Sequence, residues 1–452
     1  MTNTTKFKVA ICGAGIGGLT TAVALSKCPE IEVEVFEAAS QLGEVGAGVG
    51  IFPRPWEVIR LLDLEEELLK HSEAKRTDGL NTMFTYRKSD QAEGLEFFDL
   101  KMKGNLMAFH RADFQKVLLN RLPAACRIHC SKRLKSYTQN GLSSGPNSIE
   151  LFFEDGSSST CDVLLGADGL KSAVRKSWVA EQTGSGLGVD GILDLADPVW
   201  SGTTAYRALI PAEKLRVRAP QHRSLTQFTK FLGKNGFVIT YPISHGKLIN
   251  FAAFTARHDL ENSKFDGPWM CPVNKSEFAP YFEHWEPDVQ ELFEVVDTAL
   301  RWAVHVTRPL PSFVSRNVAL LGDAAHAMTP HQGSGAGQAL EDAYTLATLL
   351  SHPSVTRSTI HTALTVYDEI RRPASQEAAT RTRLSGRYIT FADDLSSSFW
   401  QKGRAEQLEE LRAIGMAVEK NWVWAWTTSV QDDVERALIR LEESLTASRS
   451  SL

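Results

Sequence analysis

FKVAICGAGIGGLTTAVALSK, residues 7–27, is the stretch that decides the fold of this chain. Its first six residues are nearly all apolar, which is typical of a parallel strand buried on both faces. A glycine-rich turn follows, and residues 19–27 continue with a helical pattern. Residues 31–37, IEVEVFE, alternate and are rich in valine, which predicts a second strand. The chain therefore opens with a β-α-β unit.

The turn GAGIGG, residues 13–18, matches the GxGxxG pattern of dinucleotide-binding units. Gly13 allows the tight turn, Gly15 lets the backbone approach a pyrophosphate, and Gly18 lets helix and strand pack closely. Glu37 ends the second strand, where its carboxylate can accept both hydroxyls of a ribose. These features predict a bound adenosine dinucleotide. A tight helix–strand turn without a ligand is the alternative.

A second glycine-rich segment lies deep in the chain, where GDAAH (322–326) ends a buried strand and PHQGSGAG (330–337) precedes a helix. That helix starts at Gly335 and Ala336, and its free N–H groups could cradle the electron-rich edge of a reduced flavin. Asp323 suits a ribose or ribityl hydroxyl, with a helix cap as the alternative.

Residues 200–255 differ in sequence pattern from the segments before them. WSGTTAYRALI, SLTQFTKFL, GFVITYPI and LINFAAFTA are short, aromatic and β-branched segments, which predict a separate antiparallel sheet. We therefore expect an α/β fold with a Rossmann-like dinucleotide-binding domain, which the family resemblance described below implies is FAD-binding, an antiparallel substrate domain and a helical C-terminus. The expected boundaries are 1–180 for the first part of the dinucleotide domain with 80–100 joining the substrate domain, 181–305 for the substrate sheet, 306–395 for the returning segment of the dinucleotide domain, and 396–452 for the helical region.

Composition excludes several classes of protein. The 452 residues carry a net charge of −5, which argues against a nucleic-acid or anionic-membrane binder. Six scattered cysteines without a CxxC pair give no support to a disulfide scaffold or a zinc site, so no metal is expected. No run of 18 apolar residues and no secretory signal is found, which predicts a cytoplasmic enzyme without a transmembrane segment.

Three ordered motifs resemble those of the single-component flavin monooxygenases of the hydroxybenzoate-hydroxylase fold. The motifs are GAGIGG with Glu37, LLGADGLKSAVR (164–175) and GDAAHAMTPHQGSGAG (322–337), and salicylate hydroxylases and their fungal relatives are the most similar members. The resemblance implies non-covalent FAD, NADH or NADPH as a transient co-substrate, dioxygen, a phenolic substrate and a flavin hydroperoxide. No second GxGxxG opens another β-α-β unit, so we expect the nicotinamide to have no domain of its own.

The resemblance also implies cofactor contacts, residue by residue. Asp323 resembles the aspartate that binds the FAD ribitol, and Asp168 resembles the aspartate that supports FAD and nicotinamide binding. Arg111 resembles an arginine near the FAD phosphates, while Ala47 and Gly48 resemble the turn that runs beside the cofactor.

One departure from the family pattern stands at residues 53–56, where PRPW replaces a more usual Pro-Asn run. We expect this change to alter the pocket wall or the mobility of the flavin.

The expected chemistry needs an electron-rich phenol, a cation or base beside the phenol oxygen, and apolar walls that exclude water. Arg207 and Tyr241 are predicted on adjacent strands and match positions that contact phenols in fungal relatives. His331 resembles the histidine near the reacting ring in salicylate hydroxylases and is a candidate proton relay. The alternatives are a sheet arginine paired with an acid for Arg207 and core packing for Tyr241.

The favoured function is therefore hydroxylation of a hydroxybenzoate- or salicylate-like phenol, with or without loss of CO2. The runner-up is a dearomatising hydroxylase or epoxidase that acts on a polyketide-like or prenylated phenol. A flavin-fold carrier of a lipid or protein partner is the non-enzymatic alternative, and a homodimer is considered as an assembly.

Overall fold

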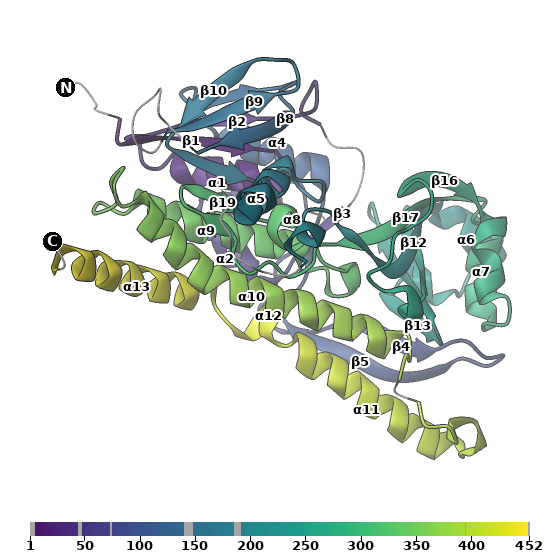
Figure 1. Cartoon of the computed structure of the whole chain (residues 1–452). Coiled ribbons are helices and arrows are strands. Elements are labelled where there is room, and N and C mark those ends of the chain that lie inside the picture. Colours follow the sequence, from purple (N-terminus) through teal and green to yellow (C-terminus); the bar gives the residue numbers. More distant parts are fainter. Residues whose placement is uncertain are drawn as a thin grey trace.

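A computed structural model describes residues 5–43, 48–72, 75–139, 148–184, 191–393 and 395–450. It contains a parallel sheet with its helices, a large antiparallel sheet, and long helices toward the C-terminus (Figure 1). The predicted α/β class is confirmed.

The parallel sheet has the strand order β18-β19-β11-β1-β2-β7. Its strands are β1 (Phe7–Cys12), β2 (Ile31–Phe36), β7 (Arg127–His129), β11 (Val163–Gly166), β18 (Val314–Ser315) and β19 (Val318–Leu320). Only β18 runs antiparallel to its neighbour among these described strands. Helix α1 (Ile16–Leu25) packs against α9 (Gly335–Ser351), so segments from opposite ends of the chain form one core.

Two smaller groups of strands accompany the parallel sheet. A three-stranded antiparallel sheet consists of β8 (Leu134–Thr138), β9 (Ile149–Phe153) and β10 (Ser158–Cys161). A two-stranded ribbon pairs β3 (Gly48–Ile51) with β6 (Met107–His110). Helix α4 (Arg111–Arg121) follows β6 directly and packs against α1.

The antiparallel part is an eight-stranded sheet with the order β16-β17-β12-β15-β14-β13-β4-β5. Its strands are β4 (Leu80–Lys88), β5 (Leu95–Lys103), β12 (Val199–Pro211), β13 (Thr229–Gly233), β14 (Gly236–Ile243), β15 (Leu248–Ala256), β16 (Met270–Asn274) and β17 (Thr298–Val306). The hairpin β4–β5 comes from the early part of the chain and joins the sheet through a parallel pairing of β4 with β13.

Both faces of the eight-stranded sheet are buried. One face carries Tyr206, Phe231 and Phe251, which pack with residues of α6 (Ala212–Arg218) and α7 (Pro287–Glu294). The opposite face carries side chains that pack with residues of the C-terminal helices: Ala205, Leu232, Phe237, Ala252 and Phe254. That second face is the one directed toward the parallel-sheet part of the molecule, because His331 contacts Phe237 and Phe254 there.

Long helices join the two parts (Figure 1). Helix α10 (Ile360–Ile389) passes beneath both, while α11 (Arg404–Trp422) packs against β5 and α13 (Val430–Ser450) packs against α9 and α10. No helix in the described ranges is long and apolar enough to cross a bilayer.

Arg54 anchors the C-terminal helices through a buried charge network. It lies in α2 (Pro53–Leu61), and its Nε and Nη2 lie 3.1 and 3.2 Å from the Glu341 carboxylate. It also contacts Asp433 of α13, while Arg371 of α10 binds Glu341 at 3.0 Å and Asp342 at 2.9 Å. The unusual residue of the PRPW segment is therefore directed into a network that joins α2, α9, α10 and α13.

We expect Arg54→Met to lower the free energy of unfolding by about 3 kcal/mol, because it removes one of the cations that compensate the buried carboxylates of Glu341 and Asp433. The value lies at the lower end of the usual range because Arg371 still pairs with Glu341. Urea unfolding measures the change. Arg440→Met is the matched control, since Arg440 pairs with Glu369 at an exposed site, and equal midpoints for both variants would contradict the assignment.

Candidate active site

The dinucleotide turn has one crowded side and one open side. Gly13 has φ +105°, and a Cβ on it would lie 2.3 Å from the Ala167 carbonyl oxygen. A Cβ on Gly18 would lie 2.0 Å from the carbonyl oxygen of Gly13. By contrast, no described atom lies within 4 Å of a Cβ built on Gly15. The fold thus requires Gly13 and Gly18, while the free space at Gly15 fits a pyrophosphate that approaches the backbone.

Two side chains hold the peptide of Ala14 in this turn. The Glu37 carboxylate accepts hydrogen bonds from the N–H groups of Ala14 and Ala39, both at 2.7 Å. Gln115 donates to the Ala14 carbonyl at 3.0 Å. The sequence analysis missed Gln115, although it lies four residues after Arg111 on α4 and therefore on the same helical face.

Arg111 and Gly48 lie together at the start of α4. Gly48 is paired with His110 in the β3–β6 ribbon, which places it next to Arg111, the first residue of the helix. Arg111 is half-buried. Ala47, the other residue expected in this turn, lies outside the described residues.

Asp168 stabilises the loop that contacts the dinucleotide turn. Its carboxylate accepts hydrogen bonds from Ser172 Oγ and from the N–H groups of Ala173 and Val174, at the start of α5 (Ala173–Gly184). Burial raises the pKa of this carboxyl group. The loop lies against Gly13, so the side chain acts on the cofactor side of the molecule by holding the loop in place.

The second glycine-rich segment presents a helix N-terminus and a free carboxylate. Asp323 is exposed at the start of α8 (Asp323–His326), and no hydrogen bond within the described part of the chain engages its carboxylate. Helix α9 begins at Gly335, where a Cβ would meet no described atom within 4 Å, and Ala336 follows it half-buried. The buried Ser334 hydroxyl has no partner in the described residues. These open donors and the carboxylate fit the pyrimidine edge and the polyol of FAD.

Arg207 and Tyr241 lie on the same face of the eight-stranded sheet, but the prediction that their strands are adjacent is wrong. Strand β15 runs between them, with Ala252 opposite Arg207 and Asn250 opposite Tyr241. The strand order depends on long-range pairing, which local patterns do not reveal. Arg207 is half-buried and makes no ion pair with an acid among the described residues, which removes the structural alternative considered for it there.

The Tyr241 side chain is neutral, and its ring packs against another aromatic ring. It stacks on Phe228 with the ring centroids 4.9 Å apart. Burial raises the pKa of the Tyr241 phenol, and the nearby Arg207 partly opposes this effect. The side chain is therefore suited to donate a hydrogen bond to an anion.

His331 is buried at the boundary between the second glycine-rich segment (residues 322–337), which we call the flavin-loop segment, and the eight-stranded sheet. Its ring lies 5.7 Å from Phe237 and 6.2 Å from Phe254, measured between centroids, and a Cβ on Gly386 would lie 2.3 Å from its Cδ2. Its Nδ1 has no hydrogen-bond partner in the described structure. Burial, with a smaller effect of Lys230, lowers the pKa of His331 to about 3, so the imidazole is neutral at ordinary pH.

His326 has a different environment from His331. Its Nε2 lies 2.5 Å from an oxygen of Asp342, beneath α9. The pairing with His326 and Arg371 outweighs burial and lowers the pKa of Asp342 to about 2. His326 is thus part of the buried charge network.

Lys230 is a charged residue of this face that the sequence analysis missed. Its side chain is 3% exposed and makes no hydrogen bond or ion pair within the described residues. Its Nζ lies over three rings, 4.6 Å from the centroid of Phe84, 5.4 Å from Tyr86 and 5.1 Å from Trp422. Burial lowers the pKa of Lys230 to about 7. The signal in the sequence was a lone lysine in the strand segment TKFLG, all of which is buried.

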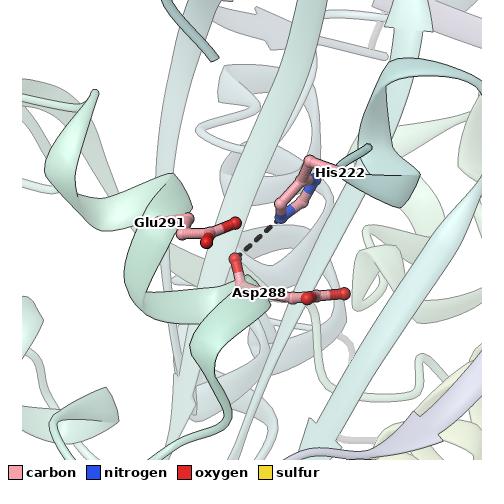
Figure 2. A group of neighbouring side chains, drawn as sticks. All are labelled: His222, Asp288 and Glu291. Atoms are coloured by element: carbon pink, nitrogen blue, oxygen red, sulfur yellow. Dashed lines mark hydrogen bonds between the residues drawn. The ribbon is translucent and has the colours of Figure 1, made fainter. Parts of the chain in front are cut away.

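A group of potential metal ligands, His222, Asp288 and Glu291, lies near α7 (Figure 2). His222 Nδ1 accepts a hydrogen bond from the Ser224 N–H at 3.1 Å, and its Nε2 lies 2.8 Å from the Asp288 carbonyl oxygen. The Asp288 carboxylate pairs with Arg223 at 2.5 Å. Because both ring nitrogens and the aspartate are already engaged, we assign no metal to this group.

Similarity to known proteins assigns the chain to a family. A family model described as "FAD binding domain" matches residues 6–226 and 291–382. The FAD-dependent monooxygenase str9 of Strobilurus tenacellus is 33% identical over 97% of this chain and 99% of its own length. A salicylate hydroxylase of Pseudomonas putida is 32% identical over 96% of this chain and 94% of its own length.

A solved structure described as a salicylate hydroxylase substrate complex superimposes with a TM-score of 0.79 and 31% identity, over 96% of this chain and 98% of that one. The chain therefore belongs to the FAD-binding family of flavin-dependent monooxygenases. This membership confirms the resemblance found in the sequence, the FAD cofactor and the enzyme class.

We expect Gly15→Ala to fold normally but to bind FAD more weakly. The added methyl group meets no protein atom and instead occupies the space of the pyrophosphate. Such overpacking costs about 1–3 kcal/mol, or roughly 5- to 150-fold in Kd. Flavin fluorescence titration of the apoprotein measures the affinity, and Gly79→Ala, at another uncrowded glycine, is the control. Unchanged affinity in Gly15→Ala would place the pyrophosphate elsewhere.

Proposed function

We propose that this chain hydroxylates a phenolic substrate of the hydroxybenzoate or salicylate class with FAD, NADH or NADPH, and dioxygen. The observation that carries the proposal is the set of polar side chains on one buried sheet face beside the flavin-loop segment. Arg207, Tyr241 and Lys230 project from three strands of that face, and His331 packs against it. The similarity to a salicylate hydroxylase supports the substrate class.

Bound FAD would supply the redox chemistry, namely acceptance of a hydride from the nicotinamide and delivery of one oxygen atom of dioxygen to the ring. The chain would hold it at Gly15 and Glu37 on the adenosine side and at Asp323 and Gly335 on the flavin side. No second nucleotide-binding unit is evident in the sequence, so we propose that the nicotinamide docks transiently.

The protein would orient and polarise the phenol. Arg207 has no acidic partner among the described residues and presents a planar fork of donors that suits a carboxylate or phenolate. Tyr241 would donate a hydrogen bond to the same anion. The stacked rings of Phe237 and Phe254, 4.3 Å apart between centroids, would keep water from the reacting carbon.

The alternative reaction products differ in which ring carbon receives the oxygen atom. Attack at a carbon that bears the carboxylate leads to loss of CO2, whereas attack at a carbon that bears another substituent leads to a dearomatised product. Mass spectrometry of the product separates these outcomes.

We expect NAD(P)H oxidation by the purified yellow protein to accelerate when a suitable phenol is added. Labelled dioxygen should supply the oxygen atom of the product, because a monooxygenase reaction places one atom of dioxygen in the product. Product mass after reaction under the labelled gas measures this. Label that arrives from water instead would refute the monooxygenase reaction.

We expect Arg207→Ala to reduce product formation by roughly 30- to 1,000-fold, because loss of a charge-assisted hydrogen bond to the anionic substrate costs about 2–4 kcal/mol. Tyr241→Phe keeps the ring and tests the hydroxyl alone. Both variants should retain FAD and oxidise more NAD(P)H per product formed. Arg257→Ala, at an exposed arginine paired with Asp259, is the control. Wild-type turnover and coupling in both site variants would contradict the assignment.

A further inference from the structure

Several buried polar atoms without partners lie around Lys230. They are Tyr86 Oη, His331 Nδ1 and Trp422 Nε1, none of which has a hydrogen-bond partner in the described structure, and the Lys230 amine beside them makes no hydrogen bond or ion pair with a described residue. Buried polar groups are normally hydrogen-bonded, because an unpaired one costs free energy. The other buried lysine of this sheet, Lys88, is paired with Asp90. The unpaired groups therefore point to a polar ligand on this side of the sheet.

The strand register places Lys230 in one row with Arg207. Lys230 pairs with Ile239, Ile239 with Ala252, and Ala252 with Arg207, so all four side chains share one face. Three strand spacings of about 4.8 Å separate the two cationic residues by roughly 14 Å between Cα atoms. His331 packs on Phe237 and Phe254 of the two middle strands. The row therefore places two cationic residues on one face of the sheet, with Ile239 and Ala252 between them.

The charged and titratable groups around Lys230 leave it able to accept a proton. Tyr86 faces it from β4, His331 from the flavin-loop segment, and Trp422 from α11. The Tyr86 pKa is raised by burial and, to a smaller extent, by Glu419, so the phenol is neutral. No carboxylate among the described residues compensates the amine, and burial lowers the pKa of Lys230 to about 7. Near neutral pH a large share of Lys230 is therefore the free amine, whereas His331, with a pKa of about 3, is a weak base.

We propose that Lys230 is the base that removes the phenolic proton of the substrate and then holds the phenolate as an ion pair, an inference that rests on the proposed function. The O–H bond of the phenol breaks, the amine nitrogen forms the new N–H bond, and the electron pair stays on the phenol oxygen. No oxidant or reductant takes part in this step. Arg207, at the other end of the row, then binds the carboxylate.

The kinetic test uses the FAD-loaded enzyme and Lys230→Met, which preserves length and apolar contacts. For the wild type, kcat/KM for the best phenol should rise as pH rises through about 7, because the free amine is the active form. Lys230→Met should lose this rise and about 100-fold in kcat/KM. Lys234→Met, at an exposed lysine of the β13–β14 turn, should match the wild type.

A second variant and a binding measurement separate catalysis from folding. Lys230→Arg keeps a cation that does not release its proton at neutral pH, so it should retain FAD and lack the pH dependence. Nitrosalicylate, whose phenolate absorbs visible light, should bind the oxidised wild-type holoenzyme as phenolate and the Lys230→Met holoenzyme as phenol.

The outcomes distinguish the two proposals. If the wild type hydroxylates phenols but Lys230→Met keeps the pH-dependent rise and binds nitrosalicylate as phenolate, the role of Lys230 is wrong and the proposed function stands. If no phenol stimulates NAD(P)H oxidation by the wild type, the proposed function fails, and the inference fails with it.

Discussion

The close contact between Gly13 and the Ala167 carbonyl is the constraint on which the cofactor side of the molecule depends. It exists because β1 and β11 are paired and both end at this point, with Cys12 opposite Gly166. Only glycine fits at the turn, since a side chain would collide with the neighbouring backbone. Glu37 and Gln115 then hold the backbone of Ala14 at its N–H and its carbonyl, so the elements around β1 converge on one residue. The open space at Gly15 is a consequence of this arrangement.

Two sets of cationic residues in this protein differ in how their charge is compensated. Arg54 and Arg371 are surrounded by carboxylates and join helices from distant parts of the chain. Lys230 and Arg207 lie on a buried sheet face without acidic partners among the described residues. A desolvated charge that is paired internally serves the fold, whereas an unpaired one is stabilised when an anion binds. This difference distinguishes the structural network from the proposed substrate face.

The two faces of the eight-stranded sheet also differ in the side chains they carry. One face is covered by α6 and α7 and contributes an apolar core. The other faces the flavin-loop segment and mixes stacked rings with polar groups, which is what a phenol binding site requires. The C-terminal helix α11 closes this side with Trp422, so the end of the chain contributes to the same enclosure.

The sequence by itself determined the α/β class, the dinucleotide turn and the FAD-binding family, because these depend on short motifs whose glycines and carboxylates act within a few residues. Asp323, Gly335 and Glu37 could be selected in the same way, although their roles stay predictions. Only the tertiary structure decided that β15 separates Arg207 from Tyr241 and that Arg54 enters a buried network. It also showed that Gln115 binds the dinucleotide turn and that Lys230 is buried on the sheet face that His331 contacts. Strand order and burial on both faces arise from contacts between distant segments, and the alternation within one strand does not show which of two buried faces meets the cofactor.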